Sequence, residues 1–311
     1  MRNILIGYDG SPRGEDALAL GRKLAEASPG ADVAVVTVYQ ALPPIGPEGE
    51  PRAREQRLHA AADETLQRAR DAWPELGESS FRAIAASSPS AGLQPLAAGG
   101  DFDVIVVGAS HRQGLGRIWP GSATEQTLHG SPRAVAIAPP GYAATTDASP
   151  LRRIGLAYDG SEEGRHALDL VGDLAVGAAA AVVAISVVDT VPPPLVDAYG
   201  YGSFVEDMRE LADLHLAGAR DRLARRGVKQ IVTERPEGGP VTELVKASRQ
   251  LDLLVLGSRD HGPALRLLLG AVSSRVVRDA ACPVLIWPRS ARTETDAAAP
   301  PADLQAAQPG A

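Results

Sequence analysis

Cysteine is almost absent from this sequence of 311 residues, which contains a single one, Cys282. One cysteine excludes an intrachain disulfide framework and a cysteine-based metal cluster. Asp9 interrupts the N-terminal apolar stretch too early for a secretory signal peptide. A reducing environment fits this cysteine usage best, so we expect the protein to be cytoplasmic. Because Cys282 precedes Pro283 at the start of a short apolar run, we expect it to be a buried packing residue.

Long hydrophobic runs and a positive charge excess are also lacking. The uncharged, alanine-rich run at residues 174–188 contains Gly177 and is shorter than the roughly 20 residues that a membrane-spanning helix needs. The chain has 31 basic and 38 acidic residues, a formal net charge of −7, whereas nucleic-acid-binding domains usually carry a basic excess. We therefore expect neither a membrane nor a nucleic acid as a partner. The hydrophobic fraction of 44% is typical of globular proteins, and the length suggests about two domains.

Several catalytic signatures are missing. None of the three lysines, Lys23, Lys229 and Lys246, is followed by Ser or Thr, so the phosphate-binding loop of P-loop enzymes is absent. The sequence also lacks His-Glu-x-x-His and Gly-x-Ser-x-Gly, and no Gly-x-Gly-x-x-Gly fingerprint follows either predicted first strand. These absences argue against the common metalloprotease, α/β-hydrolase and dinucleotide-dependent classes.

An internal repeat organises the sequence. Residues 8–14 read Tyr-Asp-Gly-Ser-Pro-Arg-Gly, and residues 158–164, 150 positions later, read Tyr-Asp-Gly-Ser-Glu-Glu-Gly. Residues 103–108 and 252–257 also match, with an offset of 149 that continues to Pro139 and Pro288. The chain is therefore expected to contain two copies of one domain, since self-similarity at a fixed spacing indicates repeated structural units. We predict domains at residues 1–140 and 151–289, a linker at 141–150 and a disordered tail at 290–311.

Each copy alternates short apolar runs with segments of helical periodicity. Ser11 and Pro12 are suited to begin a helix, and helices are predicted at residues 52–72, 91–98 and 122–128 of the first copy. The predicted strands are residues 4–6, 34–39, 81–85, 104–107 and 134–138, and then 154–157, 182–188, 230–233, 253–256 and 284–287. Such alternation predicts an α/β fold with a doubly wound parallel sheet in each copy.

Two polar turns in each copy are candidate ligand-binding segments, because ligands of open parallel sheets bind beyond the carboxyl ends of the strands. In the first copy, Asp9 follows the first strand, and a glycine- and arginine-containing segment follows the fourth strand from Gly108 to Ser122. Glycines and a helix N-terminus favour an anion such as a nucleotide phosphate. Two structural alternatives remain open: the glycines serve only to close a strand-helix turn, and Asp9 and Asp159 only cap the helices that follow.

These motifs resemble those of the universal stress protein family in its tandem two-domain form. The resemblance covers about residues 3–139 and 153–288. It is carried by the Tyr-Asp-Gly-Ser turns and by the pattern of Gly, two residues, Gly, nine residues, then Gly-Ser/Thr after the fourth strand. It implies two Rossmann-like domains of the adenine nucleotide alpha hydrolase-like type, each with a five-stranded parallel sheet of order 3-2-1-4-5 flanked by helices.

The resemblance also implies a binding site for ATP with Mg²⁺. The first-strand aspartate would contact adenine, a valine near the end of the second strand would line the adenosine pocket, and the glycine segment would hold the phosphates. The residues at these positions in the first copy are Asp9, Val38, Gly108, His111, Gly121 and Ser122. Those in the second copy are Asp159, Val187, Gly257 and Gly270.

Departures from the family pattern make the first copy the better candidate site. The second motif glycine is replaced by His111 in the first copy and by Asp260 in the second. A histidine could donate a hydrogen bond to a phosphate, whereas an aspartate would repel one. The second copy also has Ala271 where the pattern has a hydroxyl, so we expect it to bind nucleotide poorly or not at all.

The sequence thus predicts a cytoplasmic stress-response protein that binds ATP mainly in its first domain and is not an enzyme. A slow, incidental ATP hydrolysis remains compatible with it. The alternative is a nucleotide-free interaction module of the same fold, and a true ATP-cleaving enzyme is a third hypothesis. Because edge strands are exposed templates for pairing, the resemblance further implies that the two domains pair through their last strands. A homodimer of the whole chain is compatible with the sequence, which does not decide it.

Overall fold

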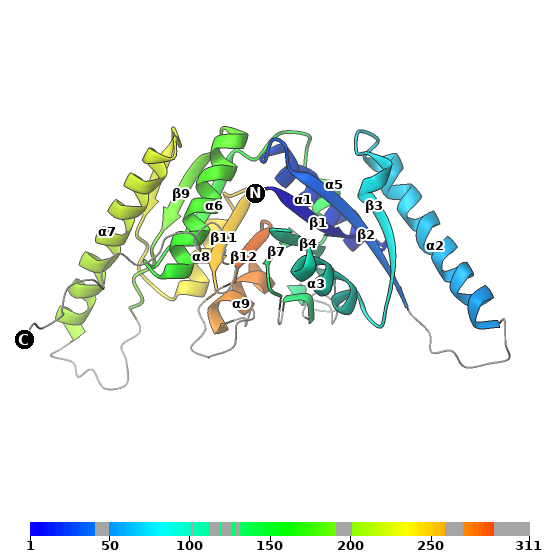
Figure 1. Ribbon diagram of the computed structural model, residues 1–311. Helices are drawn as coiled ribbons and strands as arrows, with labels where there is room; N and C mark the ends of the chain where they lie inside the picture. Colours follow the sequence, from blue (N-terminus) through cyan, green and yellow to red (C-terminus); the bar gives the residue numbers. More distant parts are fainter. Residues whose placement is uncertain are drawn as a thin grey trace, which may run out of the picture.

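The protein is described by a computed structural model that covers residues 1–40, 50–100, 102–111, 118–119, 126–128, 131–190, 201–258 and 270–288. The predicted tail at residues 290–311 and much of both glycine-containing segments lie outside these described residues. The described chain contains two similar halves, each built from alternating strands and helices (Figure 1).

The first half contains the strands β1 (Asn3–Gly7), β2 (Asp32–Gln40), β3 (Phe81–Ala86), β4 (Val104–Gly108), β5 (Ser110–His111), β6 (Ile118–Trp119) and β7 (Ala134–Ala138). Its helices are α1 (Pro12–Glu26), α2 (Glu50–Ala72), the 3₁₀ turn η1 (Glu78–Ser80) and α3 (Pro89–Gly99). A short helix, α5 (Tyr142–Thr145), lies in the connection to the second half.

The second half repeats the same order with strands β8 (Arg153–Ala157), β9 (Ala181–Ile185), β10 (Ile231–Glu234), β11 (Leu253–Gly257) and β12 (Val284–Trp287). Its helices are α6 (Glu162–Ala178), α7 (Tyr201–Arg225), α8 (Pro240–Ser248) and α9 (Ala271–Asp279). The predicted α/β class is therefore confirmed for both halves.

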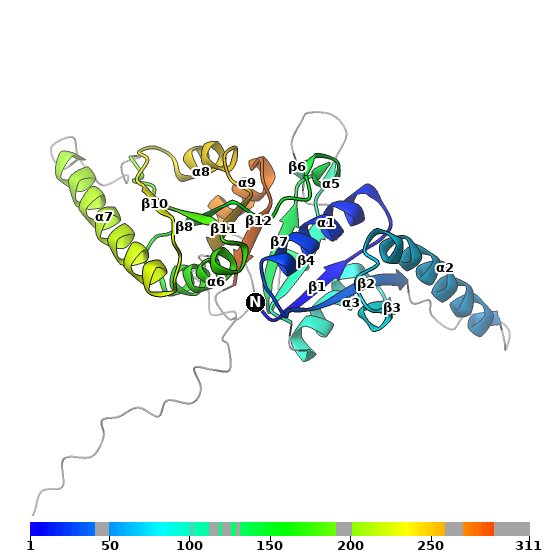
Figure 2. The ribbon, with the colours of Figure 1, turned by 90° about the horizontal axis from the view of Figure 1, so that it is seen from above.

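The two halves share one ten-stranded sheet. Its order is β10-β9-β8-β11-β12-β7-β4-β1-β2-β3, so each half has the order 3-2-1-4-5 that the resemblance implies. Neighbouring strands within each half are parallel, whereas β7 and β12 pair antiparallel, with Ala136 opposite Leu285. Figure 2 shows the consequence: α2 and α7 lie at the two far ends of the molecule, and the last strands meet in the middle.

Both faces of the sheet are covered by helices, which explains why the central strands are continuously apolar. On one face, Ile4 and Ile6 of β1 belong to a core that includes Leu20 of α1 and Leu66 of α2. On the other face, Leu5 packs in a second core with residues of α3, α8 and α9. Alternate residues of one strand therefore point into opposite cores, as the strand period of two requires.

Three local features differ from the sequence prediction. The second strand of the second half was predicted to continue to Val188 but ends at Ile185; beyond it, Val188 forms only an isolated bridge with Glu237. The two-residue strands β5 and β6, which pair antiparallel, were not predicted. Neither was α5, because a four-residue helix in a segment rich in turn formers has no periodic signal.

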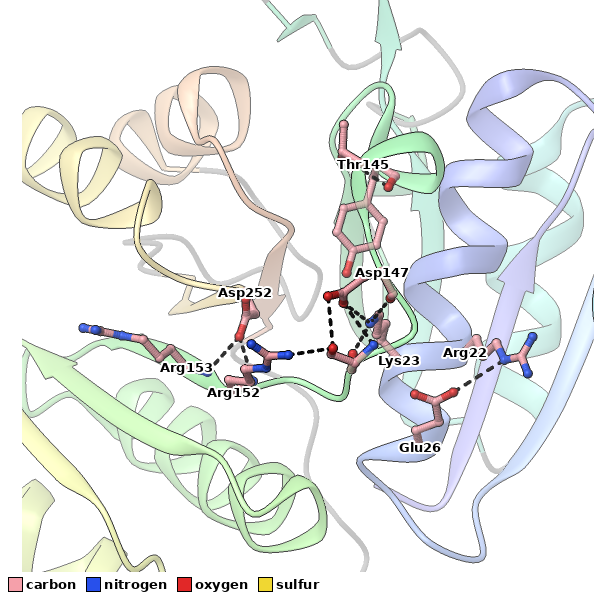
Figure 3. Close-up of polar contacts among 10 residues, drawn as sticks. Arg22, Lys23, Glu26, Thr145, Asp147, Arg152, Arg153 and Asp252 are labelled. Atoms are coloured by element: carbon pink, nitrogen blue, oxygen red, sulfur yellow. Dashed lines mark hydrogen bonds and ion pairs between the residues drawn. The ribbon is translucent and has the colours of Figure 1, made fainter.

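The connection between the halves is attached to α1 by two buried charged residues. The Asp16 carboxylate accepts hydrogen bonds from the backbone N–H groups of Gly141 (2.9 Å) and Ala143 (2.8 Å) at the start of α5. The Lys23 ammonium donates to the carbonyl oxygens of Asp147 (2.5 Å) and Ser149, as Figure 3 shows for Lys23 and Asp147. This segment is therefore an ordered connection that is bound to the first half.

An aspartate before the fourth strand binds the start of the first strand in both halves. Asp252 accepts hydrogen bonds from the backbone N–H groups of Arg152 (2.7 Å) and Arg153 (2.8 Å), as Figure 3 shows. Asp103 forms the equivalent bonds with Arg2 and Asn3. The match between residues 103 and 252 in the repeat therefore has a structural cause. Within the described ranges, no helix combines the length and apolar character needed to cross a bilayer.

Candidate functional site

A cavity of about 150 Å³ lies at the carboxyl ends of β1 and β4 in the first half. It is lined by Gly7, Tyr8, Asp9, Arg13, Gly14, Val36, Val38, Pro89, Leu93, Val107, Gly108 and Thr127. Three of the predicted site residues, Asp9, Val38 and Gly108, therefore come together here from three separate parts of the sequence. Of the others in this half, Gly121 and Ser122 lie outside the described residues, and His111 lies in β5.

The two oxygens of Asp9 have different surroundings. Oδ1 accepts hydrogen bonds from the backbone N–H of Ser11 (3.0 Å) and from the Ser11 hydroxyl. Oδ2 faces the Arg13 guanidinium at 3.3 Å, and the Asp9 side chain is 55% exposed. Ser11 in turn caps α1 by accepting from the backbone N–H of Gly14 (3.4 Å). The local capping interpretation of Asp9 is therefore confirmed for one oxygen, and the other lies at the mouth of the cavity beside a cation.

Gly108 has a packing reason to be glycine. A Cβ atom at this position would lie 2.1 Å from the carbonyl oxygen of Arg13, far inside van der Waals contact. The end of β4 is thus packed against the first turn of α1 without space for a side chain. This close approach holds the two polar turns of the half against each other and fixes the backbone of Arg13 beside the cavity.

Beneath these turns the cavity is closed by a buried tyrosine. The Tyr8 hydroxyl donates a hydrogen bond to the Glu15 carboxylate, and the ring is almost completely buried. Burial raises the pKa of Tyr8, and the hydrogen bond to the Glu15 carboxylate raises it further. The Tyr8 hydroxyl therefore stays protonated at physiological pH and is used by Glu15, while Tyr8 contributes to the cavity wall.

Apolar side chains form the remaining walls. Val36 and Val38 come from β2, Leu93 from α3 and Val107 from β4. A flat apolar group such as a nucleobase is suited to such a slot, with Asp9 as the polar group at its edge. Sequence reasoning identified Val38 but missed Leu93 and Arg13. Arg13 lies two residues after the Tyr-Asp-Gly-Ser turn, and its position in the first helical turn was the available signal.

The second half has the same turn with different neighbours. Asp159 accepts from the backbone N–H of Ser161 at 3.0 Å and from its hydroxyl, as Asp9 does from Ser11. A Cβ atom at Gly257 would lie 3.2 Å from the backbone nitrogen of Gly164. This approach is looser than that at Gly108. Val187 is partly buried against the core that contains α8 and α9, and Gly270 is the N-cap residue of α9.

A second cavity in the described part of the chain, of about 400 Å³, is lined by titratable residues that include Glu55, His59 and Asp63. No group of three or more His, Cys, Asp and Glu residues there could hold a metal ion. His59 and Asp63 form an exposed pair on α2, with 2.9 Å between Nδ1 and Oδ2. Cys282 is buried, as predicted for a packing residue, and burial raises the pKa of its thiol to about 12.

The sequence profile of the universal stress protein family matches residues 1–139 and again residues 150–288. The chain belongs to the universal stress protein family. Among curated relatives, a universal stress protein of Mycobacterium tuberculosis is 27% identical over 299 residues, which cover 92% of this chain and 99% of the relative. A universal stress protein of Methanocaldococcus jannaschii is 33% identical over 142 residues, 43% of this chain and 81% of the relative.

A solved universal stress protein from Archaeoglobus fulgidus has the same fold. The similarity covers 92% of this chain and 96% of that one, with a TM-score of 0.58 and 17% sequence identity. The family resemblance deduced from the two turns is therefore confirmed, and so is the tandem organisation, since two universal stress units follow each other in this chain.

Proposed function

We propose that this universal stress protein binds an adenine nucleotide, ATP with Mg²⁺, in the cavity of its first half and acts without catalytic turnover. The observation that carries the proposal is the convergence of Asp9, Val38 and Gly108 on one cavity at the switch point between β1 and β4. Ligands of open α/β sheets bind at such a point. The proposed setting is the cytoplasm, where nucleotide occupancy would bias an interaction with a regulatory partner.

The described residues fit the base end of such a ligand. The cavity of about 150 Å³ is smaller than the roughly 300–1,000 Å³ of complete small-molecule sites, so it would hold only a part of the nucleotide. Val38 and Leu93 would contact the base, and Asp9 would accept a hydrogen bond from its amino group. The phosphates would lie toward the segment with His111, Gly121 and Ser122.

Magnesium would reach the site with the nucleotide. No cluster of metal-ligating side chains occurs among the described residues, and Mg²⁺ is commonly held by substrate phosphates with few protein ligands. The hydroxyl that donates to Asp9, that of Ser11, also caps α1, and this structural use is why we propose binding rather than hydrolysis. The second half, with Asp159, Val187, Gly257 and Gly270, would bind ATP poorly because Asp260 and Ala271 stand in its glycine segment.

A nucleotide-free interaction module is the second candidate, and two observations favour it. Oδ1 of Asp9 is already used by Ser11, and Gly108 is required by the carbonyl of Arg13 whether or not a ligand binds. Both features would persist in a protein that never binds ATP. The two candidates therefore differ in a single measurable property, the affinity for the nucleotide.

Calorimetric titration of the full chain with Mg-ATP tests the proposal. We expect one binding event per chain. A Val38→Phe variant, which fills the cavity, is expected to abolish it, and the corresponding Val187→Phe variant of the second half is expected to retain it. Thermal melting of both variants controls for folding, and a phosphate-release assay is expected to detect no sustained turnover.

The outcomes separate the candidates. No heat of binding with the unmodified chain would favour the interaction module. Loss of binding in Val187→Phe with retention in Val38→Phe would move the site to the second half. Rapid phosphate release would contradict the non-catalytic role and support the enzyme hypothesis.

A further inference from the structure

The first turns of α1 and α6 are closely similar in their backbone and cap interactions. In both, the aspartate accepts from the backbone N–H of the serine two residues later, at 3.0 Å. In both, that serine caps the helix by accepting from a glycine N–H, at 3.4 Å for Gly14 and 3.1 Å for Gly164. The two turns are therefore a matched pair, in which a difference in ligand preference has to come from other side chains.

The second residue of the helix carries a positive charge in α1 and a negative charge in α6. It is Arg13 in α1 and Glu163 in α6, 150 positions apart in the sequence. Arg13 lines the cavity and lies 3.3 Å from Oδ2 of Asp9. The mouth of the first-half cavity therefore carries an aspartate with an arginine, whereas the sequence position that corresponds to Arg13 in the second half is a glutamate.

Arg13 combines a fixed backbone with an adaptable side chain. Its carbonyl oxygen is packed against Gly108, whereas its side chain is 44% exposed. An exposed ion pair contributes little stability, so the guanidinium can turn from Asp9 toward an incoming anion at small cost. A guanidinium has five N–H donors in a planar arrangement suited to phosphate oxygens, and the hydrogen bond to Asp9 uses one of them.

Other charged residues also lie in the first turns of α1 and α6. Glu15 of the first half is used by the Tyr8 hydroxyl, and Arg165 of the second half donates to the carbonyl oxygen of Gly160 at 3.2 Å. Glu162, next to Glu163, adds a further carboxylate to the first turn of α6.

We propose that Arg13 makes the first-half cavity selective for the anionic, phosphorylated form of its ligand. This inference rests on the proposed nucleotide binding and adds which chemical part of the ligand is selected and by which residue. It requires Arg13 to contact phosphate, so the affinity for the neutral nucleoside should not depend on Arg13.

Titration of the full chain with two probes, Mg-ATP and adenosine, tests the assignment. Arg13→Gln and Arg13→Glu are compared with Arg22→Gln, which removes a cation of similar exposure (43%) from a position on α1 that pairs with Glu26. We expect Arg13→Gln to lower the affinity for Mg-ATP about tenfold, the loss of one charge-assisted hydrogen bond. Arg13→Glu is expected to lower it further, and Arg22→Gln to leave it within about twofold.

Adenosine affinity is expected to remain within about twofold in all three variants, because the nucleoside carries no charge. The dependence of Mg-ATP affinity on salt concentration is a second measurement, expected to be weaker in Arg13→Gln than in the unmodified chain. The salt dependence is the deciding measurement if adenosine binds too weakly for titration. Thermal melting controls for folding.

The possible results distinguish failure of the proposed function from failure of the role assigned to Arg13. If the unmodified chain binds neither probe, the proposed function fails. If it binds Mg-ATP and both Arg13 variants retain that affinity with an unchanged salt dependence, nucleotide binding stands and the role of Arg13 is overturned. An equal loss of ATP and adenosine affinity in Arg13→Gln also overturns it, because the residue would then support the cavity rather than contact a phosphate.

Discussion

Gly177 of α6 is packed directly against Ala27 at the end of α1. A Cβ atom at Gly177 would lie 2.1 Å from the carbonyl oxygen of Ala27. The two residues are 150 positions apart and therefore occupy corresponding places in the two copies. Ala136 and Leu285, which face each other across β7 and β12, also correspond, with the offset of 149. Both contacts thus lie on the approximate twofold axis that relates the halves.

A side chain at Gly177 is expected to weaken the packing between the halves. Gly177→Val would push the end of α6 away from the Ala27 carbonyl, and overpacking of this kind costs about 1–3 kcal/mol. The free energy of unfolding in urea measures the effect. Gly218→Ala in α7 is the matched control. With nothing within 4 Å of its added methyl group, it is expected to stabilise the chain by about 0.5–1 kcal/mol. Equal stability of Gly177→Val and the unmodified chain would contradict the close contact.

Removal of the Asp16 carboxylate is expected to release the connection between the halves. Asp16 is only 3% exposed and holds two backbone N–H groups at the start of α5. Asp16→Ala should cost about 1.5–3 kcal/mol, because hydrogen bonds to a charged group are lost in a buried place. Tryptic cleavage after Arg152 should become faster. Asp32→Ala, at an exposed position, is expected to change stability by less than about 0.5 kcal/mol. A variant as stable and as resistant as the unmodified chain would show that α5 docks without Asp16.

The stability supplied by Asp169 is expected to depend on pH. Asp169 is 22% exposed and is bound by Arg222, with 2.6 Å between Nε and Oδ1, and by Arg226 at 3.0 Å. Burial alone would raise the pKa of Asp169, but the hydrogen bonds and charges of the two arginines outweigh it and hold the pKa below its ordinary value of 3.8. A lowered pKa in the folded state means that the stabilisation is complete above pH 3.8 and is lost as the pH falls further.

Asp169→Asn is therefore expected to cost about 1–2 kcal/mol at pH 7. The difference from the unmodified chain should stay constant from pH 7 to pH 5 and shrink as the solution is acidified below the ordinary pKa of the carboxyl group. Urea unfolding at a series of pH values measures it. Glu26→Gln breaks an exposed pair with Arg22 and is expected to have a small effect at every pH. A difference independent of pH down to acid unfolding would contradict the assignment.

Cys282 is expected to be inert in the folded protein. Burial raises the pKa of its thiol from 9.0 to about 12, and the thiolate is the reactive species. An aromatic disulfide reagent at pH 8 should therefore label the chain only after unfolding. Because the folded pKa is the higher one, stability relative to Cys282→Ala should fall as the pH rises from about 9 toward 12. Rapid labelling of the native chain at pH 8 would contradict the burial.

The repeat, the strands and the two turns could be predicted from the sequence because they are local patterns. An apolar run such as residues 104–107 is long enough to identify a buried strand, and a Tyr-Asp-Gly-Ser turn is recognisable by itself. Contacts that join distant residues were not foreseen. In the sequence, Asp16 and Lys23 have the pattern of ordinary polar positions of an amphipathic helix. They bind the connection between the halves only because the folded chain brings that connection next to α1.

Likewise, only some residues of the candidate site could be predicted from the sequence. Asp9, Val38 and Gly108 were identified by their motif positions, whereas Leu93 lies on a helix that only the three-dimensional packing brings to the cavity. The predicted end of the second strand at Val188 was wrong because the apolar run continues after the ladder to β10 stops at Ile185. Apolar periodicity alone does not distinguish a paired residue from a buried one that follows the strand.

The covalent joining of the halves has a consequence for their junction. Two identical subunits would place the same residue on both sides of a twofold axis, so every substitution there would occur twice. Here a glycine contacts an alanine at one place on the axis, and an alanine lies opposite a leucine at the other. The fused chain can thus fit a small residue against a larger one, and its association survives any dilution. Each half is also free to change its sequence independently of the other.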